Sequence, residues 1–77
     1  MRRSLIVTPD ASGLPIAEVP CSCMWDLVEY LSYQRVVVTY HYYPSHFTVT
    51  FERISLKSAQ RLLDEWVHAE ALELQPA

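Results

Sequence analysis

Glycine is nearly absent from this chain: its 77 residues include one glycine, Gly13, and five prolines. A loop that binds phosphate groups needs several glycines, because the backbone must approach the phosphates without side chains in between. The sequence therefore excludes a nucleotide-binding loop of that type. It contains neither the Gly-x-Ser-x-Gly motif of hydrolases nor the His-Glu-x-x-His motif of metalloproteases. Since a chain this small also encloses a water-free pocket with difficulty, we expect a protein that is not an enzyme.

Positive charge and long apolar runs are also scarce. Six Lys and Arg residues stand against nine Asp and Glu residues, which gives a formal net charge of −3. Phosphate backbones do not attract a negative chain, so the composition disfavours nucleic-acid binding, which would need a local patch of Arg2, Arg3, Arg35 and Arg53. No segment reaches the roughly 18 apolar residues that cross a bilayer, and Pro9 interrupts the first apolar segment too early for a secretion signal. We expect a cytoplasmic protein that binds no membrane.

Cysteine is limited to Cys21 and Cys23. A disulfide scaffold usually has about four to eight cysteines spread along the chain, so disulfides do not hold this fold. The simplest interpretation is two small residues at the start of a helix, one of them buried. The alternative is a thiol-redox site or a zinc site at Cys21 and Cys23, although Cys-x-Cys is not the usual Cys-x-x-Cys spacing. No other cofactor is expected.

The composition is that of one folded domain spanning residues 1–77, with 51% apolar and 19% charged residues. Residues 3–8 predict a short strand that ends at Pro9, because proline removes a ladder donor. Residues 9–20 contain three prolines and the glycine, which predicts a loop or an arm on the surface. Ser22 is expected to cap a helix that runs to about Tyr33. Its apolar face has helical spacing and consists of Met24, Leu27, Val28 and Leu31.

Residues 35–42 and 45–54 alternate with a period of two and predict an antiparallel hairpin. A two-residue turn at Tyr43-Pro44 gives three pairs on the core face: Tyr40 with Phe47, Val38 with Val49 and Val36 with Phe51. On the outer face the same turn sets Arg35 opposite Glu52, Thr39 opposite Thr48 and His41 opposite His46. A four-residue loop keeps the same faces with different partners, whereas a three-residue loop sets apolar against polar positions. Tyr43 and Pro44 do not suit a tight primed turn, which leaves a cis-proline turn or the longer loop, and we favour the longer loop.

The last predicted element is a helix that follows Ser55 as its N-cap. One face carries Leu56, Ala59, Leu63, Trp66, Val67 and Leu74, with Leu62 at its edge and His68 on the solvent side. Residues 75–77 form a C-terminal tail. The order β-α-β-β-α predicts the α+β class, a small two-layer domain in which two helices pack on one face of an antiparallel hairpin or sheet.

The most unusual composition is the aromatic cluster at the hairpin end, where no Lys or Arg stands between Val36 and Glu52. Proteins that bind single strands interleave aromatic with basic residues, so a protein partner is favoured over a nucleic acid. We expect a small binding or regulatory module that uses an exposed sheet face, a sheet edge or the hairpin end, with a homodimer as one form. The candidate interaction residues are Arg35, Thr39, His41, Tyr43, His46 and Thr48. The competing interpretations are that the histidines are ordinary polar residues of an outer face, or that His41 and His46 join Cys21 and Cys23 in a tetrahedral zinc site.

Overall fold

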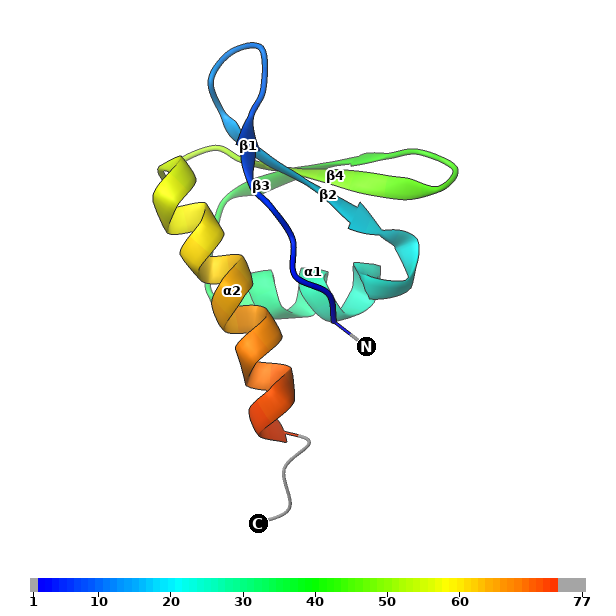
Figure 1. Ribbon diagram of the computed structural model, residues 1–77. Coiled ribbons are helices and arrows are strands. Elements are labelled where there is room, and N and C mark those ends of the chain that lie inside the picture. Colours follow the sequence, from blue (N-terminus) through cyan, green and yellow to red (C-terminus); the bar gives the residue numbers. More distant parts are fainter. Residues whose placement is uncertain (1, 74–77) are drawn as a thin grey trace.

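The computed structural model describes residues 2–73, with the side chains of residues 2–70 (Figure 1). Its elements are β1 (Thr8–Pro9), β2 (Pro15–Pro20), a 3-10 turn (Cys21–Cys23), α1 (Met24–Tyr33), β3 (Val38–Tyr42), β4 (His46–Phe51) and α2 (Leu56–Glu73). The strands form one antiparallel sheet in the order β1-β2-β4-β3, and both helices lie on the same side of it. The α+β prediction is confirmed, while Leu74 and the predicted tail at residues 75–77 lie outside the described residues.

The prediction for the N-terminal part was wrong in two respects. The segment expected as a loop or arm contains β2, which pairs with β1 on one side and with β4 on the other. The segment expected as a strand is extended but joins the sheet only at Thr8 and Pro9. The turn between β1 and β2 is closed by Asp10, whose Oδ1 accepts the N–H groups of Ser12 and Leu14, and Gly13 takes the positive φ of 87°. Two prolines bracket β2, so its ends resemble a loop in sequence.

The ends of α1 also differ from expectation. The helix begins at Met24, after the 3-10 turn, and Cys23 stands at its N-cap position without a side-chain hydrogen bond, so Ser22 is not the cap. At the other end Arg35 adopts a φ of 56°. The backbone N–H of Arg35 donates to the carbonyl of Ser32 at 3.2 Å, and the backbone N–H of Val36 donates to the carbonyl of Leu31 at 3.4 Å. This is a Schellman termination with arginine in the place that glycine usually occupies. Arg35 therefore ends a helix and is not paired with Glu52 in a strand.

The hairpin has the longer loop that we favoured. Tyr42 pairs with Phe47, and Tyr40 and Val38 pair with Val49 and Phe51. The cis-proline alternative is wrong because every described peptide bond is trans. The two-residue register is wrong as well, so His41 stands opposite Thr48 and not His46.

The core lies between the sheet and the helices. Its central layer is Phe47, Val49 and Phe51 of β4, which are fully buried because β4 is flanked by β2 and β3. The remaining buried hydrophobic residues are Leu5, Val7, Ala17, Val19, Cys23, Leu27, Leu31, Ala59, Leu63 and Trp66. The core faces predicted for the helices are confirmed except at Val28, which is half-buried outside the core cluster, and at Leu56, which is exposed. The solvent position of His68 is confirmed. Ser55 caps α2 as predicted, because its Oγ accepts the N–H of Ser58 at 3.1 Å.

The N-terminal segment is held outside the sheet by the side chain of Gln60. Its Nε2 donates to the carbonyl of Leu5, and its Oε1 accepts the N–H of Val7, both at 2.8 Å. The amide thus supplies the donor and acceptor that a neighbouring strand would supply. Leu5 and Val7 can then turn into the core although their backbone has no ladder partner there.

Arg2 fastens the start of this segment to both helices. Its Nε and Nη2 donate to the two carboxylate oxygens of Asp26 in α1, at 2.7 and 2.9 Å, and its Nη1 donates to the carbonyl of Trp66 in α2 at 2.6 Å. The guanidinium carbon lies 5.4 Å from the centre of the Trp66 ring. The paired donors hold the pKa of Asp26 below its ordinary value, against a smaller opposing effect of burial.

Replacement of Gln60 tests the role of its amide. We expect Gln60→Ala to lower the free energy of unfolding by about 1–3 kcal/mol, because two backbone groups lose their partner where water reaches them poorly. Gln60→Glu keeps the acceptor for Val7 but sets a carboxylate against the carbonyl of Leu5, so it is expected to destabilise as well. Urea unfolding measures both variants. Stability equal to wild type in both would show that the amide does not hold the segment.

The pH dependence of stability tests the pair of Arg2 and Asp26. The folded-state pKa of Asp26 is lower than the ordinary value of 3.8. Its stabilisation is therefore complete above the unfolded-state pKa and is lost as the pH falls through the folded-state pKa. We expect Asp26→Asn to cost about 0.2–1 kcal/mol near neutral pH, since the carboxylate is partly exposed, and to cost nothing at pH values below the folded-state pKa.

The matched control separates this pair from the effect of a carboxylate in the first turn of α1. In an Arg2→Gln background, Asp26→Asn is expected to cost less than in the wild type. Urea unfolding at both pH values gives the comparison. An equal cost in the two backgrounds would assign the effect to the helix terminus and not to Arg2.

Candidate functional site: an open sheet edge and an aromatic hairpin end

Strand β3 forms one edge of the sheet, since β4 is its single neighbour in the order β1-β2-β4-β3. Residues 36–51, which include the whole strand, contain no Lys, Arg, Asp or Glu. The strand itself, Val38–Tyr42, contains no proline. An edge of this kind offers unpaired backbone groups to another strand, and natural edges usually carry charges, prolines or bulges that prevent such pairing.

The hydrogen bonds at both ends of β3 show which of its backbone groups are unpaired. The N–H of Tyr43 donates to the carbonyl of His46 at 2.8 Å, and the N–H of Glu52 donates to the carbonyl of Val37 at 3.2 Å. In an antiparallel pair the bonded residues alternate, so Thr39 and His41 face β4 between these two positions. The N–H and C=O groups of the other three strand residues point away from the sheet. These residues are Val38, Tyr40 and Tyr42.

On the core side, the open edge carries a cluster of three rings. Tyr40 and Tyr42 lie on the same face as Phe47, with ring centres 6.1 and 6.0 Å from that of Phe47. Burial and the neighbouring Tyr42 raise the pKa of Tyr40, so its phenol stays neutral. Tyr42 is 60% exposed. The apolar face therefore continues past the core into solvent at the hairpin end.

On the outer side, three further rings lie in contact at the hairpin end. Tyr43 lies between His41 and His46, at centre distances of 4.9 and 4.8 Å, and its ring is nearly parallel to that of His46, with an angle of 19°. Ser45 Oγ lies 3.0 Å from Nδ1 of His46, in hydrogen-bond contact. Figure 1 shows the hairpin end extending beyond both helices. The six rings, which we call the aromatic end, are those of Tyr40, His41, Tyr42, Tyr43, His46 and Phe47.

Three of the six predicted interaction residues come together in this way: His41, Tyr43 and His46. Thr48 lies opposite His41 on the same outer face and is half-buried. Thr39 pairs with Thr50, and its hydroxyl donates to a carboxylate oxygen of Glu52 at 2.5 Å. Arg35 is exposed, but it belongs to the end of α1.

The sequence placed the side chains of Val38, Tyr40 and Tyr42 on the core face, with Tyr40 and Tyr42 also in the aromatic cluster, but it gave no role to the backbone groups of these residues. Their alternation identifies the buried face but does not reveal which backbone groups lack a partner, because that depends on the order of the strands. The one signal in the sequence was the absence of charge from residues 36–51. In a strand, that absence fits either a buried position or an edge that pairs with another strand.

The two cysteines lie close to the aromatic end in the sheet register. Pro20 stands opposite His46, and Cys21 follows it directly. Cys21 is exposed and Cys23 is buried, and neither is in a disulfide. Within residues 2–73 no group of three or more His, Cys, Asp and Glu side chains is arranged to hold a metal ion. The zinc and redox alternatives stay predictions of the sequence.

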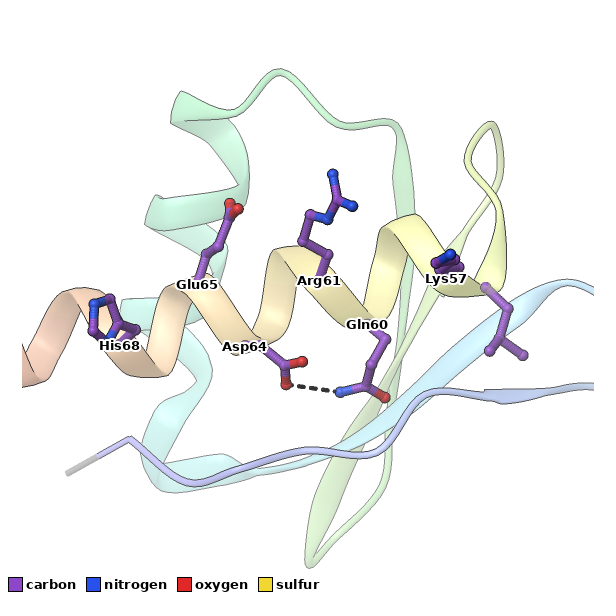
Figure 2. A pocket seen from close by; sticks show the side chains of 7 residues that line it. Lys57, Gln60, Arg61, Asp64, Glu65 and His68 are labelled. Carbon is purple, nitrogen blue, oxygen red and sulfur yellow. Dashed lines mark hydrogen bonds between the residues drawn. The ribbon is translucent and has the colours of Figure 1, made fainter.

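Two hollows on the described surface lie outside the aromatic end. The larger, of about 630 Å³, is lined by Leu56, Lys57, Gln60, Arg61, Asp64, Glu65 and His68. All of these side chains belong to α2, and Figure 2 shows Arg61 and Glu65 on one side of the helix and Gln60 and Asp64 on the other. A gap between side chains of one convex helix cannot surround a ligand. The smaller, of about 440 Å³, lies between residues 4–8 and β2, and Glu18 is its one ionisable lining residue.

Amide hydrogen exchange tests the assignment of the open edge. At low protein concentration we expect the amides of Val38, Tyr40 and Tyr42 to exchange quickly, because they have no acceptor, and those of Thr39, His41 and Tyr43 to be protected. Exchange rates by NMR check this. Equal protection along the strand at every concentration would show that our assignment of the bonded residues is wrong.

In comparisons with known proteins, no protein-family model, curated protein or solved structure matches the chain. Among the described residues, no helix combines the length and apolar character needed to cross a membrane.

Proposed function

We propose that this protein is a small, non-enzymatic protein-binding module whose β3 edge accepts an extended strand of a protein partner. The observation that carries the proposal is the open edge, with outward N–H and C=O groups at Val38, Tyr40 and Tyr42 on an uncharged strand. In strand addition the main-chain hydrogen bonds supply affinity and the side chains beside the strand supply specificity.

The two edges of the sheet differ in a way that supports this proposal. At the opposite edge, β1 has two residues, and Pro9 pairs there with Pro15, so neither can donate a ladder bond. Beyond β1 the chain leaves the sheet and bonds to Gln60. That edge is protected in the usual ways, whereas β3 has none of these protections.

The aromatic end supplies side-chain contacts next to the open edge. Tyr42 on the core side and Tyr43 on the outer side are 60% and 46% exposed. Tyrosine rings offer a large contact area for little loss of side-chain entropy and are enriched among the residues that dominate protein interfaces. The absence of Lys and Arg from residues 36–51 favours a protein over a nucleic acid as the partner.

A peptide titration tests the proposal. The probe is a capped peptide with the sequence of residues 36–44, flanked by lysines for solubility, added to dilute protein and followed by NMR. We expect shifts and slower exchange at the amides of Val38, Tyr40 and Tyr42. Tyr42→Pro removes an outward N–H that β4 does not use, so this variant is expected to fold and to bind at least tenfold more weakly.

Two controls make the result specific. His41→Pro removes an N–H that faces β4, so it is expected to lower stability where Tyr42→Pro does not. The pair Tyr43→Ala and His46→Ala removes two rings of the outer face, of which Tyr43 is exposed and His46 is half-buried, and is expected to weaken binding while leaving the fold intact. A peptide that binds Tyr42→Pro as well as wild type, or that binds neither, would overturn the proposal.

A further inference from the structure

We infer that the strand accepted by the β3 edge is β3 of a second copy of this chain, paired antiparallel about a two-fold axis at Tyr40. This inference rests on the proposed function and names its partner. The two sheets then continue into one another across the axis. The argument has three parts: the spacing of the outward backbone groups, the exposed side chains beside them, and the absence of charge.

The spacing of the outward groups selects one register. They belong to Val38, Tyr40 and Tyr42, which are symmetric about Tyr40. Pairing centred there sets Tyr40 against Tyr40 of the partner subunit, and Val38 against Tyr42 of the partner subunit. Every outward N–H then meets an outward carbonyl, because bonded positions recur at every second residue. A centre at Thr39 or His41 leaves some of these groups without a partner.

The same register covers the hydrophobic side chains exposed along this edge. Val37, Tyr42 and Tyr43 are 45%, 60% and 46% exposed. On the core side Tyr42 meets Val38 of the partner subunit, and on the outer side Val37 meets Tyr43 of the partner subunit. Pairs of aromatic and β-branched side chains are among those that stabilise neighbouring strands. Polar side chains are also paired with polar ones, because Thr39 meets His41 of the partner subunit on the outer face.

Charge favours a second copy over a partner of complementary charge. A two-fold axis sets each strand against an identical one, so a charged residue at the centre of the strand would lie near its own copy. Residues 36–51 have no Lys, Arg, Asp or Glu, so self-pairing brings no such repulsion. The edge also offers no charge by which to select a differently charged partner. A domain of about this size buries only about 60% of its unfolded surface, so a shared interface adds substantially to its core.

The first experiment measures self-association of the whole chain by analytical ultracentrifugation over a range of concentrations. We expect a monomer–dimer equilibrium. Tyr42→Lys replaces the ring that meets Val38 of the partner subunit by a charged side chain and is expected to raise the dimer dissociation constant at least tenfold. The matched control is Tyr33→Lys, because Tyr33 is 78% exposed and belongs to α1 and not to β3, and its replacement is expected to leave the dissociation constant unchanged.

The second experiment tests the register by disulfide formation in a Cys21→Ser background. An equal mixture of Thr39→Cys and His41→Cys chains is oxidised mildly. In the inferred register these positions face each other in a non-bonded pair, with Cα atoms about 4.5 Å apart, which a disulfide can bridge. Two copies of Thr39 lie about 8 Å apart, beyond that reach. We therefore expect the mixed cross-link and little cross-linking of either variant alone.

The outcomes separate the inference from the proposed function. A dimer that lacks the mixed cross-link, or that is unaffected by Tyr42→Lys, overturns the inferred pairing. A chain that stays monomeric at millimolar concentration overturns the second copy as partner, and peptide binding in the NMR titration then leaves the binding module standing. Failure of both the peptide and self-association removes the proposed function as well.

Discussion

The pairing of Tyr42 with Phe47 across the hairpin is the constraint on which the rest of the structure depends. Because side chains alternate along a strand, this pair sets Phe47, Val49 and Phe51 on one face and so decides what the helices can bury. It also decides which residues of β3 bond to β4. A shift of one residue would turn the aromatic face to solvent. The buried core and the open edge are therefore two consequences of one register.

The rest of the chain protects the β1 edge of this sheet and leaves the β3 edge open. Proline at positions 9 and 15 ends the pairing at the β1 edge, and the backbone of Leu5 and Val7 bonds to Gln60 in place of a strand. Arg2 then secures the segment to α1 and α2 through Asp26 and the Trp66 carbonyl. Within residues 2–73, no comparable device covers the outward groups of Val38, Tyr40 and Tyr42. This asymmetry, more than any single side chain, supports the assignment of β3 as the binding surface.

Local patterns predicted the elements whose partners are close in sequence. The spacing of apolar residues predicted the hairpin and both helices, and the poor fit of Tyr43 and Pro44 to a tight turn predicted the longer loop. The strand β2 was missed because its alternation lies between Pro15 and Pro20 and its main partner, β4, is far along the chain. Arg35 was misplaced because it precedes a run of valines, and the left-handed helix ending that it adopts is usually a glycine position. At the candidate site, composition identified His41, Tyr43 and His46, whereas the open backbone groups required the strand order, which no period reveals.

An unprotected edge usually invites open-ended association, and the two-fold pairing inferred here avoids it. In that arrangement each chain uses its β3 edge once, and the two β1 strands become the outer edges of the joined sheet. Those edges carry Pro9, paired with Pro15, and the chain beyond them is bound to Gln60. Growth beyond two copies would have to use these outer edges, where Pro9 and Pro15 offer no donor to a further strand. Pro9 and Pro15, which made β2 hard to predict from the sequence, thus have a structural role: they confine strand pairing to the β3 edge, next to the aromatic end.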